Sequence, residues 1–294
     1  MLYQKQRIFL VGALVLSAGL SEAQVHRTFV SVNGNDANTC LTPAAACRTI
    51  NAAITKVDAN GEVIITTTGS YSGAAITKAV RINAPSGIVA FAALPITINA
   101  PAANVVIRGF TIKAVTPGSG VGITVTDVGT LLLENMVVDG WGTGVEVNAA
   151  GSKFSVSNST FRNNTDRAGI EFNAAANASV VMSQFENNAR GILIDTNVTA
   201  TVTASRSSFT GSSGSGLSVF SGGGVFAADR CLIANNSNQG IFLGAGSVVR
   251  LSGSSITGNG LGVSTTGTFE TFGTSGIRGN TTNVSGTLTA VALQ

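Results

Sequence analysis

Apolar residues recur along most of the chain at intervals of 21 to 26 residues, and we call them the anchor column. A repeat of this length is typical of a solenoid, in which each repeat stacks on the next. A second apolar or small residue precedes each anchor by five positions. The anchors are Ile112, Val138, Phe161, Phe185, Phe209, Ile233, Ile256 and Ile277. The preceding residues are Ile107, Leu133, Val156, Val180, Ala204, Ala228, Leu251 and Phe272.

A glycine followed by alternating apolar residues comes after most anchors, and no segment between the anchors has helical spacing. Each repeat therefore reads as about three short strands separated by bends. Such strands become stable when neighbouring repeats, about 4.8 Å apart, bond to both of their edges. The pattern predicts an all-β, single-stranded parallel β-helix. The glycine-led strands are 144–147, 169–172, 191–194, 216–219 and 240–243.

Polar residues form columns at fixed offsets from the anchors, which supports the same register. Two positions before the anchors we expect an inward stack in which Cys231 replaces a serine, and three positions after them an amide ladder. Gly and Asn three positions before the anchors indicate a bend with positive φ. The inward stack is Phe110, Met136, Ser159, Ser183, Ser207, Cys231, Ser254 and Ser275. The amide ladder is Asn164, Asn188, Asn236, Asn259 and Asn280, and the bend is Gly109, Asn135, Asn158 and Gly253.

Charges alternate in sign one position after the anchors, from Lys113 through Asp139 and Arg162 to Glu186. Arg108 and Glu134 make a second pair of the same kind. An exposed cross-strand stack of opposite charges is expected to look like this.

The chain before the repeats predicts a cap. Residues 27–34 read as a first strand, and Ile50, Ala53, Ile54 and Val57 have helical spacing. A short helix here would close the end of the solenoid, where strand edges and core are otherwise open. We place the cap at 27–61 and the coils at 62–290, within one β-helix domain of residues 24–294.

Residues 1–23 have the pattern of a secretory signal peptide, with Lys5 and Arg7 before an apolar run and a small-x-small site at its end. The apolar run is short for a membrane span, although an uncleaved anchor is the alternative. In an exported protein, Cys40 and Cys47 are expected to form a local disulfide rather than remain free thiols. We therefore expect a secreted, periplasmic or cell-surface protein with no stable membrane span after cleavage.

The segments FVSVNGNDANTC at 29–40 and CRTINAAI at 47–54, followed by a β-helix, resemble secreted bacterial right-handed parallel β-helix repeat proteins of the pectin-lyase-like superfamily. The resemblance implies a right-handed solenoid and raises the hypothesis of cleavage of an acidic polysaccharide. The motifs of polygalacturonase-like hydrolases, a paired Asp, Gly-His-Gly and Arg-Ile-Lys, are missing. The one histidine, His26, lies far from the coils, which leaves no Ser-His or Cys-His pair and no histidine-based metal site.

One acidic cluster is the candidate catalytic site. Glu146 and Glu171 fall at the same place in consecutive coils, Asp195 follows in the next, and Arg167 and Arg190 lie just upstream. The functional interpretation is a calcium-assisted uronate site with an arginine as base, since calcium binds several carboxylate oxygens. The alternative is a solvated charged face. No other metal site or cofactor is predicted.

Trp141, in a bend between two glycines, is a candidate sugar-stacking platform, or else it plugs a coil end or packs under a loop, and Phe220 and Phe242 could also face outward. After removal of Lys5, Arg7 and Glu22, 15 basic and 13 acidic residues remain, and no basic run has interleaved aromatics. Nucleic acid is therefore not an expected partner.

The coils contain no histidine and no paired-aspartate motif. Both absences favour a non-catalytic surface or matrix protein that binds a glycan or a protein partner. The alternative is a polysaccharide lyase acting on an acidic polysaccharide. The sequence assigns no oligomeric state.

Overall fold

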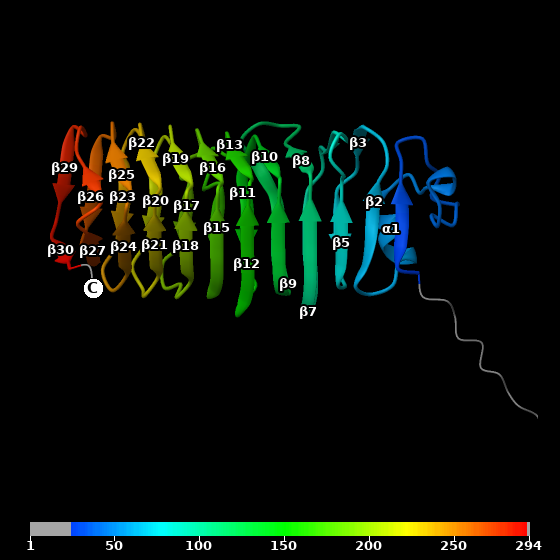
Figure 1. The fold of residues 1–294 in the computed structure, drawn as a ribbon, viewed down its shortest axis with the longest axis horizontal. Helices are drawn as coiled ribbons and strands as arrows, with labels where there is room; N and C mark the ends of the chain where they lie inside the picture. The colour runs from blue at the N-terminus through cyan, green and yellow to red at the C-terminus, as the bar shows by residue number, and fades with distance from the viewer. Residues whose placement is uncertain (1–24, 293–294) are drawn as a thin grey trace, which may run out of the picture.

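The computed structural model describes residues 25–292, so the predicted signal peptide at 1–23 lies outside it. The chain winds into a parallel β-helix whose turns lie side by side along a rod (Figure 1). Each regular turn contributes one strand to each of three faces, which we number in chain order, as in β12–β13–β14. Every strand pair in register is parallel, as the repeat predicts.

The first face contains β1 (Arg27–Val30), β2 (Gly61–Ile65), β5 (Val80–Asn83), β12 (Ser152–Ser157), β15 (Ala176–Val181), β18 (Thr201–Ser205), β21 (Val225–Asp229), β24 (Val248–Ser252), β27 (Thr268–Phe272) and β30 (Leu288–Val291). The second face contains β3 (Gly69–Tyr71), β6 (Ala90–Ala92), β8 (Phe110–Lys113), β10 (Val137–Asp139), β13 (Thr160–Arg162), β16 (Gln184–Glu186), β19 (Ser208–Thr210), β22 (Leu232–Ala234), β25 (Ser255–Thr257) and β28 (Gly276–Ile277).

The third face contains β4 (Ala74–Ile76), β11 (Trp141–Val147), β14 (Ile170–Phe172), β17 (Ile192–Ile194), β20 (Ser215–Val219), β23 (Gln239–Leu243), β26 (Leu261–Thr265) and β29 (Thr282–Ser285). Two long strands, β7 (Ile96–Arg108) and β9 (Ser119–Glu134), each run through the third face and continue into the first.

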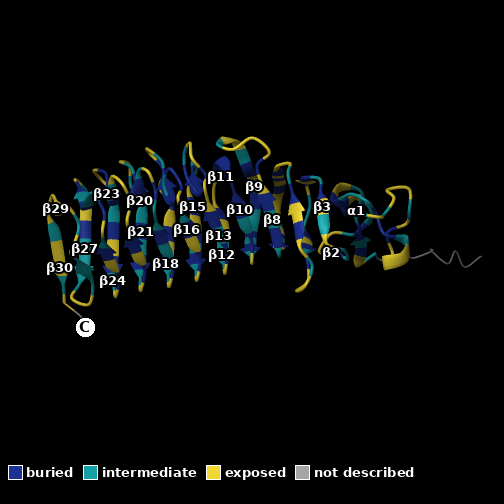
Figure 2. Cartoon of the chain, turned by 90° about the horizontal axis from the view of Figure 1, so that it is seen from above, coloured by how far each residue is buried: buried dark blue, intermediate teal, exposed yellow. Residues whose placement is uncertain are grey.

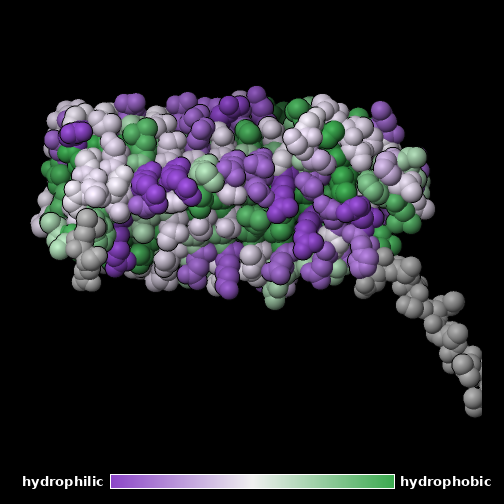
Figure 3. All heavy atoms as spheres, viewed as in Figure 1, coloured by the Kyte–Doolittle hydropathy of each residue, from purple (hydrophilic) through white to green (hydrophobic). Residues whose placement is uncertain are grey.

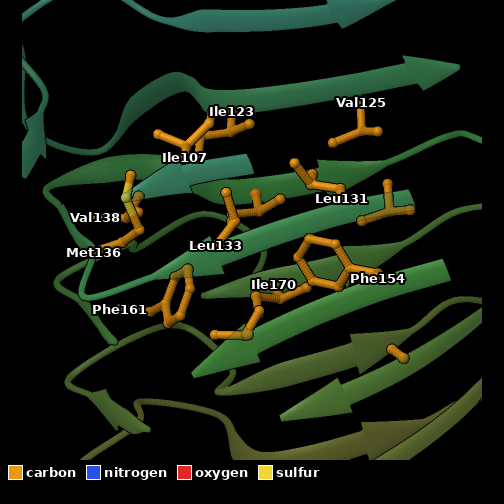
Figure 4. Packing of buried hydrophobic residues seen from close by; sticks show 14 of the residues in the cluster. Ile107, Ile123, Val125, Leu131, Leu133, Met136, Val138, Phe154, Phe161 and Ile170 are labelled. Carbon is orange, nitrogen blue, oxygen red and sulfur yellow. The ribbon is translucent and has the colours of Figure 1, made fainter. Parts of the chain in front are cut away.

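The core is a set of inward columns, and the anchor column is confirmed over its whole length. Its eight residues pair in unbroken register from Ile112 on β8 to Ile277 on β28. Phe161, Phe185 and Phe209 stack face to face, with ring centroids 5.0 and 4.8 Å apart. Figure 4 shows Leu133, Val138 and Phe161 pointing into the same interior from different faces.

One member of the second apolar column was predicted wrongly. Leu251 pairs with Thr271, not with Phe272. The connection from the first to the second face is one residue longer in this last regular turn, because Thr271 precedes the anchor Ile277 by six positions instead of five. The other members, from Ile107 to Leu251, pair as predicted.

The predicted cap helix is α1 (Ile50–Lys56), preceded by a 3-10 turn, η1 (Pro43–Ala45). The Thr49 side chain accepts a hydrogen bond from the Ala52 N–H, which caps the helix start. Ile50, Ala53 and Ile54 are buried against the first turn. Cys40 and Cys47 form the predicted disulfide, with their Cα atoms 5.0 Å apart. No helix among residues 25–292 is long and apolar enough to cross a membrane.

Two polar ladders run inside the rod beside the anchors. In the serine stack, the Ser159 and Ser183 N–H groups donate to the hydroxyl oxygens of Ser183 and Ser207 in the following turns. Cys231 occupies a serine position and is buried, and this burial raises the pKa of its thiol to about 11. Burial has this effect because it disfavours the thiolate.

In the amide ladder, the side chain of Asn164 donates to that of Asn188 at 2.9 Å, and Asn236 donates likewise to Asn259. Ser212 interrupts the ladder, and its buried hydroxyl has no hydrogen-bond partner among the described residues.

Two bends with positive φ flank the second-face strands. The leading bend lies three positions before the anchor, and the trailing bend lies two positions after it. The leading bend is Gly109, Asn135, Asn158, Met182, Arg206, Arg230 and Gly253, with φ from 48° to 73°. The trailing bend is Gly140, Asn163, Asn187, Gly211, Asn235, Gly258 and Gly279, with φ from 54° to 82°. The sequence predicted the glycines and asparagines of the leading bend, whereas Met182, Arg206 and Arg230 adopt the same conformation without being recognised in advance.

The predicted charge columns lie on the outer surface, except that Asp139, expected to be exposed, is buried between its partners. Arg108 Nε lies 2.6 Å from Glu134 Oε2, and Asp139 lies between Lys113 and Arg162 at 3.9 and 3.2 Å. Glu186 pairs in register with Arg162. Buried residues alternate with intermediate or exposed ones along the strands, and many of the bends are exposed (Figure 2). Polar and apolar groups are interspersed over the face in Figure 3.

Candidate functional site

A column of outward-pointing residues on the third face forms the floor of the candidate site. These residues alternate with inward ones such as Val145, Ile170 and Ile192, so they point away from the core. Glu171, Leu193 and Ser218 are nevertheless buried. Arg167 contacts Glu171, and Arg190 and Phe220 line a hollow with Ser218. We call this column and its covering side chains the third-face groove. In register the floor is Thr124, Glu146, Glu171, Leu193, Ser218 and Phe242.

At one end of the groove the predicted acidic cluster is largely assembled. Glu146 and Glu171 are neighbours in register on β11 and β14, as the sequence indicated. The Arg167 guanidinium donates from Nε to Glu171 Oε1 at 2.8 Å and from Nη2 to Asp195 Oδ2 at 2.6 Å. These residues line a hollow of about 350 Å³. Arg167 thus compensates charge at Glu171 and Asp195, whereas Glu146, the stacked neighbour of Glu171, is not among its partners.

The electrostatics of this end centre on Arg167. The hydrogen bond to Glu171 and the charges of Glu171 and Asp195 raise the pKa of Arg167, so its guanidinium stays protonated. Glu146 accepts a hydrogen bond from Asn173 Nδ2 at 3.0 Å. Within residues 25–292, no three His, Cys, Asp or Glu side chains are grouped so that they could hold a metal ion. The cation that lies beside Glu171 and Asp195 in this structure is the Arg167 guanidinium.

Arg190 does not join the carboxylates, contrary to its predicted place in the cluster. Its guanidinium lies over the Phe220 ring, 5.6 Å from the centroid, and Phe220 meets Phe242 edge to face at 5.5 Å. Nη1 of Arg190 also donates to the Arg167 carbonyl at 3.3 Å. The side chain is directed along the bend toward the next turns, a direction that the strand register does not determine.

The other end of the groove is therefore aromatic and polar. Arg190, Phe220 and Phe242 line a hollow of about 210 Å³ together with Asn238 and Gln239. Gln239 Oε1 accepts a hydrogen bond from the Ser215 hydroxyl at 2.7 Å, which orients the amide. The sequence suggested that the two phenylalanines face outward but gave no sign of Gln239 or Asn238, since amide residues are common in every bend.

Trp141 is not a stacking platform. It is buried, and its indole Nε1 donates to the Ile112 carbonyl of an earlier turn at 3.2 Å. Of the interpretations of this residue, packing beneath a loop is the one the structure supports. In the groove, the aromatic side chains available for stacking on a sugar are Phe220 and Phe242.

The comparisons with known proteins agree with this architecture. The family model described as "Right handed beta helix region" matches residues 30–206 and 95–282. No curated protein matches the chain by sequence.

Among solved structures, pectate lyase Pel9A is similar over 92% of this chain and 79% of its own, with 16% identity and a TM-score of 0.58. A lacto-N-biosidase of glycoside hydrolase family GH136 from Eubacterium ramulus aligns over 91% of this chain and 67% of its own, with 10% identity and a TM-score of 0.40. At these identities the likeness to Pel9A shows a shared fold.

Proposed function

Since the chain belongs to the right-handed β-helix family, we propose that it is an exported protein that holds a polysaccharide in the third-face groove without cleaving it. The predicted signal peptide and the Cys40–Cys47 disulfide support export, because disulfides persist in oxidising compartments. We place it in the secreted, periplasmic or cell-surface fraction.

The aromatic end of the groove supports glycan binding. Sugar rings present apolar C–H faces that pack on aromatic side chains, and hydroxyl groups that amides and guanidinium groups bind. Phe220 and Phe242 supply the first kind of contact, and Arg190 and Gln239 supply the second. The two hollows lie on successive turns of one face, so a chain-like ligand that follows the long axis of the rod can reach both.

The single observation that argues against catalysis is the position of Arg167. An arginine between Glu171 and Asp195, with a raised pKa, is a poor proton acceptor. Its pairing also occupies two of the three carboxylates that a calcium-assisted mechanism would need. His26, the one histidine in the sequence, lies directly before β1 in the cap and not in the groove.

The second candidate is a polysaccharide lyase acting on an acidic polysaccharide, with calcium as its cofactor. Its specific support is the convergence of Glu146, Glu171, Asp195 and Arg167 on one hollow, in a fold shared with a pectate lyase. In that reaction a base removes a proton beside the uronate carboxyl group. The arginine would first have to leave its two carboxylate partners.

Binding is tested with the full chain against a panel of soluble plant, bacterial and animal polysaccharides by isothermal titration calorimetry. We expect Phe242→Ala to weaken binding of the preferred glycan about tenfold, through lost stacking. Phe91→Ala, which truncates another exposed phenylalanine on the second face, is the matched control and should change nothing. Equal loss in both variants, or binding of none of the glycans, would rule out this groove as a glycan site and favour a protein partner.

A further inference from the structure

The leading bend departs from the rest of the repeat in three consecutive turns. Met182, Arg206 and Arg230 have φ of 48°, 50° and 51°, between Asn158 and Gly253. The trailing bend meets the same backbone requirement with Gly or Asn in all seven turns. Bulky side chains are disfavoured in this conformation, and such strain is often retained where a residue has a function. The chain thus keeps three long side chains where its own pattern supplies less strained ones.

These three side chains border one hollow. All three are exposed, and they line a volume of about 470 Å³ at the start of the second-face strands. Its floor contains Gln184 and Ser208, which are neighbours in register and offer an amide and a hydroxyl group. Leu232 continues the same row in the next turn and is itself exposed. The surface combines cations, hydrogen-bonding groups and two apolar side chains.

The charge in this hollow is positive and only partly balanced. Arg206 and Arg230 belong to successive turns, about 4.8 Å apart, so their guanidinium groups repel unless an anion lies between them. Arg230 Nε contacts Asp229 Oδ2 at 2.8 Å in an exposed ion pair. Arg206 takes part in none of the ion pairs found within residues 25–292.

The turn that follows accommodates this arrangement. A Cβ added to Gly253 would lie 3.1 Å from Arg230 Cγ and 3.7 Å from Asp229 Oδ1. The glycine therefore leaves room for the Arg230 side chain to lie across the next turn beside its partner. On the other side of the pair, Met182 extends the row with an exposed thioether.

We propose that Met182, Arg206 and Arg230 form a second binding surface, which takes an anionic polysaccharide and is separate from the third-face groove. Guanidinium groups bind carboxylate and sulfate oxygens in pairs, in a geometry that lysine does not reproduce. Their repeat along the rod matches a polymer that runs parallel to the long axis and carries a charge on successive units. Met182 and Leu232 pack against the carbon faces of its sugars.

Asparagine substitution at the bend tests the proposal, because Asn135 and Asn158 already hold this conformation in the same column. Arg206→Asn and Arg230→Asn should each raise the melting temperature by about 2 °C, since they relieve backbone strain. Each should also weaken binding to polygalacturonate or dextran sulfate about tenfold. A gain in stability together with a loss of binding is not expected from a merely structural residue.

Arg81→Asn is the matched control, with the same change of charge at an exposed arginine on β5, many turns away along the rod (Figure 1). It should leave binding unchanged, and uncharged dextran should bind none of the proteins through this surface. Preference for polygalacturonate would identify the ligand group as carboxylate, and preference for dextran sulfate would identify it as sulfate.

Unaltered binding in the Arg206→Asn/Arg230→Asn double variant would overturn the proposal. Equal weakening by Arg81→Asn would also overturn it, because net charge alone would then explain the effect. Tighter binding to single-stranded DNA than to either polysaccharide would assign the surface to a different class of polymer. Phe242→Ala should not affect this surface, so the third-face groove and the leading bend succeed or fail independently.

Discussion

The leading bend and the trailing bend make the same left-handed turn seven times each, and they are filled differently. At the trailing bend the backbone is restricted and, at two of its glycines, the space is crowded, as it also is at Gly109 of the leading bend, where a Cβ would lie 2.3 Å from the Ala84 carbonyl oxygen. A Cβ on Gly211 or Gly258 would meet the side-chain Oδ1 of the asparagine one turn earlier, Asn187 or Asn235, at 2.4 or 2.3 Å. The leading bend leaves room for long side chains at Met182, Arg206 and Arg230.

This difference separates structure from function within one repeat. At the trailing bend, the positive φ and the neighbouring side chains restrict the residue type to Gly or Asn. These residues are therefore explained by the fold alone. Three residues of the leading bend oppose the conformation, so they indicate a role that the fold does not require.

The strand between the two bends should dominate stability. Phe185→Ala removes a fully buried ring that stacks with Phe161 and Phe209, and should cost about 3–5 kcal/mol in the free energy of unfolding. Phe91→Ala, at a half-exposed ring on the same face, should cost less than about 1 kcal/mol. Urea titration of both variants measures the difference, and a small loss in Phe185→Ala would show that the anchor column is not core.

The amide ladder, whose residues directly follow the trailing bend, should have the second-largest effect on stability. Asn188→Ala leaves the Asn164 backbone N–H and side-chain amide without their acceptor in a buried position, for a loss of about 2–3 kcal/mol. Asn177→Ala, the same substitution at an exposed position on β15, should be nearly neutral. If both substitutions had equal effects in urea, the ladder would not stabilise the trailing bend.

Cys231, which follows the leading bend at Arg230, should make the stability of the protein depend on pH. Burial raises the pKa of Cys231 from 9.0 to about 11, so the unfolded chain loses its thiol proton at a lower pH than the folded chain. The contribution of the protonated Cys231 thiol to the free energy of unfolding is fully present below pH 9. It is lost as pH rises toward 11, and the loss amounts to about 2 kcal/mol. Cys231→Ser, which restores the serine column, should remove that component. Identical pH profiles, or rapid labelling of the folded thiol at pH 8, would refute its burial.

Exchanging residues between the bends tests the comparison itself. Met182→Asn should stabilise the protein by about 1 kcal/mol, because Asn tolerates positive φ better than Met does. Asn187→Met, at the trailing bend of the same turn, should destabilise it by about 1 kcal/mol. Opposite signs in thermal melts support the distinction. The same sign for both would mean that strain at the leading bend is not the relevant difference.

Completing the amide ladder should give the smallest gain. In Ser212→Asn the new amide can accept from Asn188 and donate to Asn236 and to the Phe185 carbonyl, as its neighbours do. We expect about 0.5–1 kcal/mol of added stability, since a buried unpaired hydroxyl is replaced by bonded groups. Ser213→Asn, one residue outside the ladder, is the control. Destabilisation by Ser212→Asn in thermal melts would indicate that the site is too narrow.

The sequence predicted the parts of the structure that repeat. Register follows from spacing, so the anchors, both ladders and the Glu146–Glu171 neighbours were placed correctly. The error at Phe272 arose where one connection lengthened by a residue, which spacing alone does not reveal. The prediction of the leading bend was incomplete for a physical reason. In the sequence, only Gly and Asn indicate positive φ, so Met182 and the two arginines were not recognised as residues of the leading bend.

The site was harder to predict because it depends on side chains in bends. Trp141 turns inward to the Ile112 carbonyl and Arg190 reaches Phe220, directions that strand register does not specify. The position of Arg167 between Glu171 and Asp195 depends on the same loop geometry. Sequence placed the carboxylates together but did not show that one arginine forms ion pairs with two of them.

The most direct test of the central claim, polysaccharide binding without cleavage, is an absorbance assay for unsaturated products. The full chain is incubated with a panel of polyuronates and glycosaminoglycans, with and without calcium, and binding of the same substrates is measured in parallel. The account predicts that at least one polysaccharide binds and that none yields product, because Arg167 stays protonated between its carboxylate partners. Product that disappears in the Glu146→Ala/Glu171→Ala variant would contradict it and identify the acidic end of the groove as the active site of a lyase.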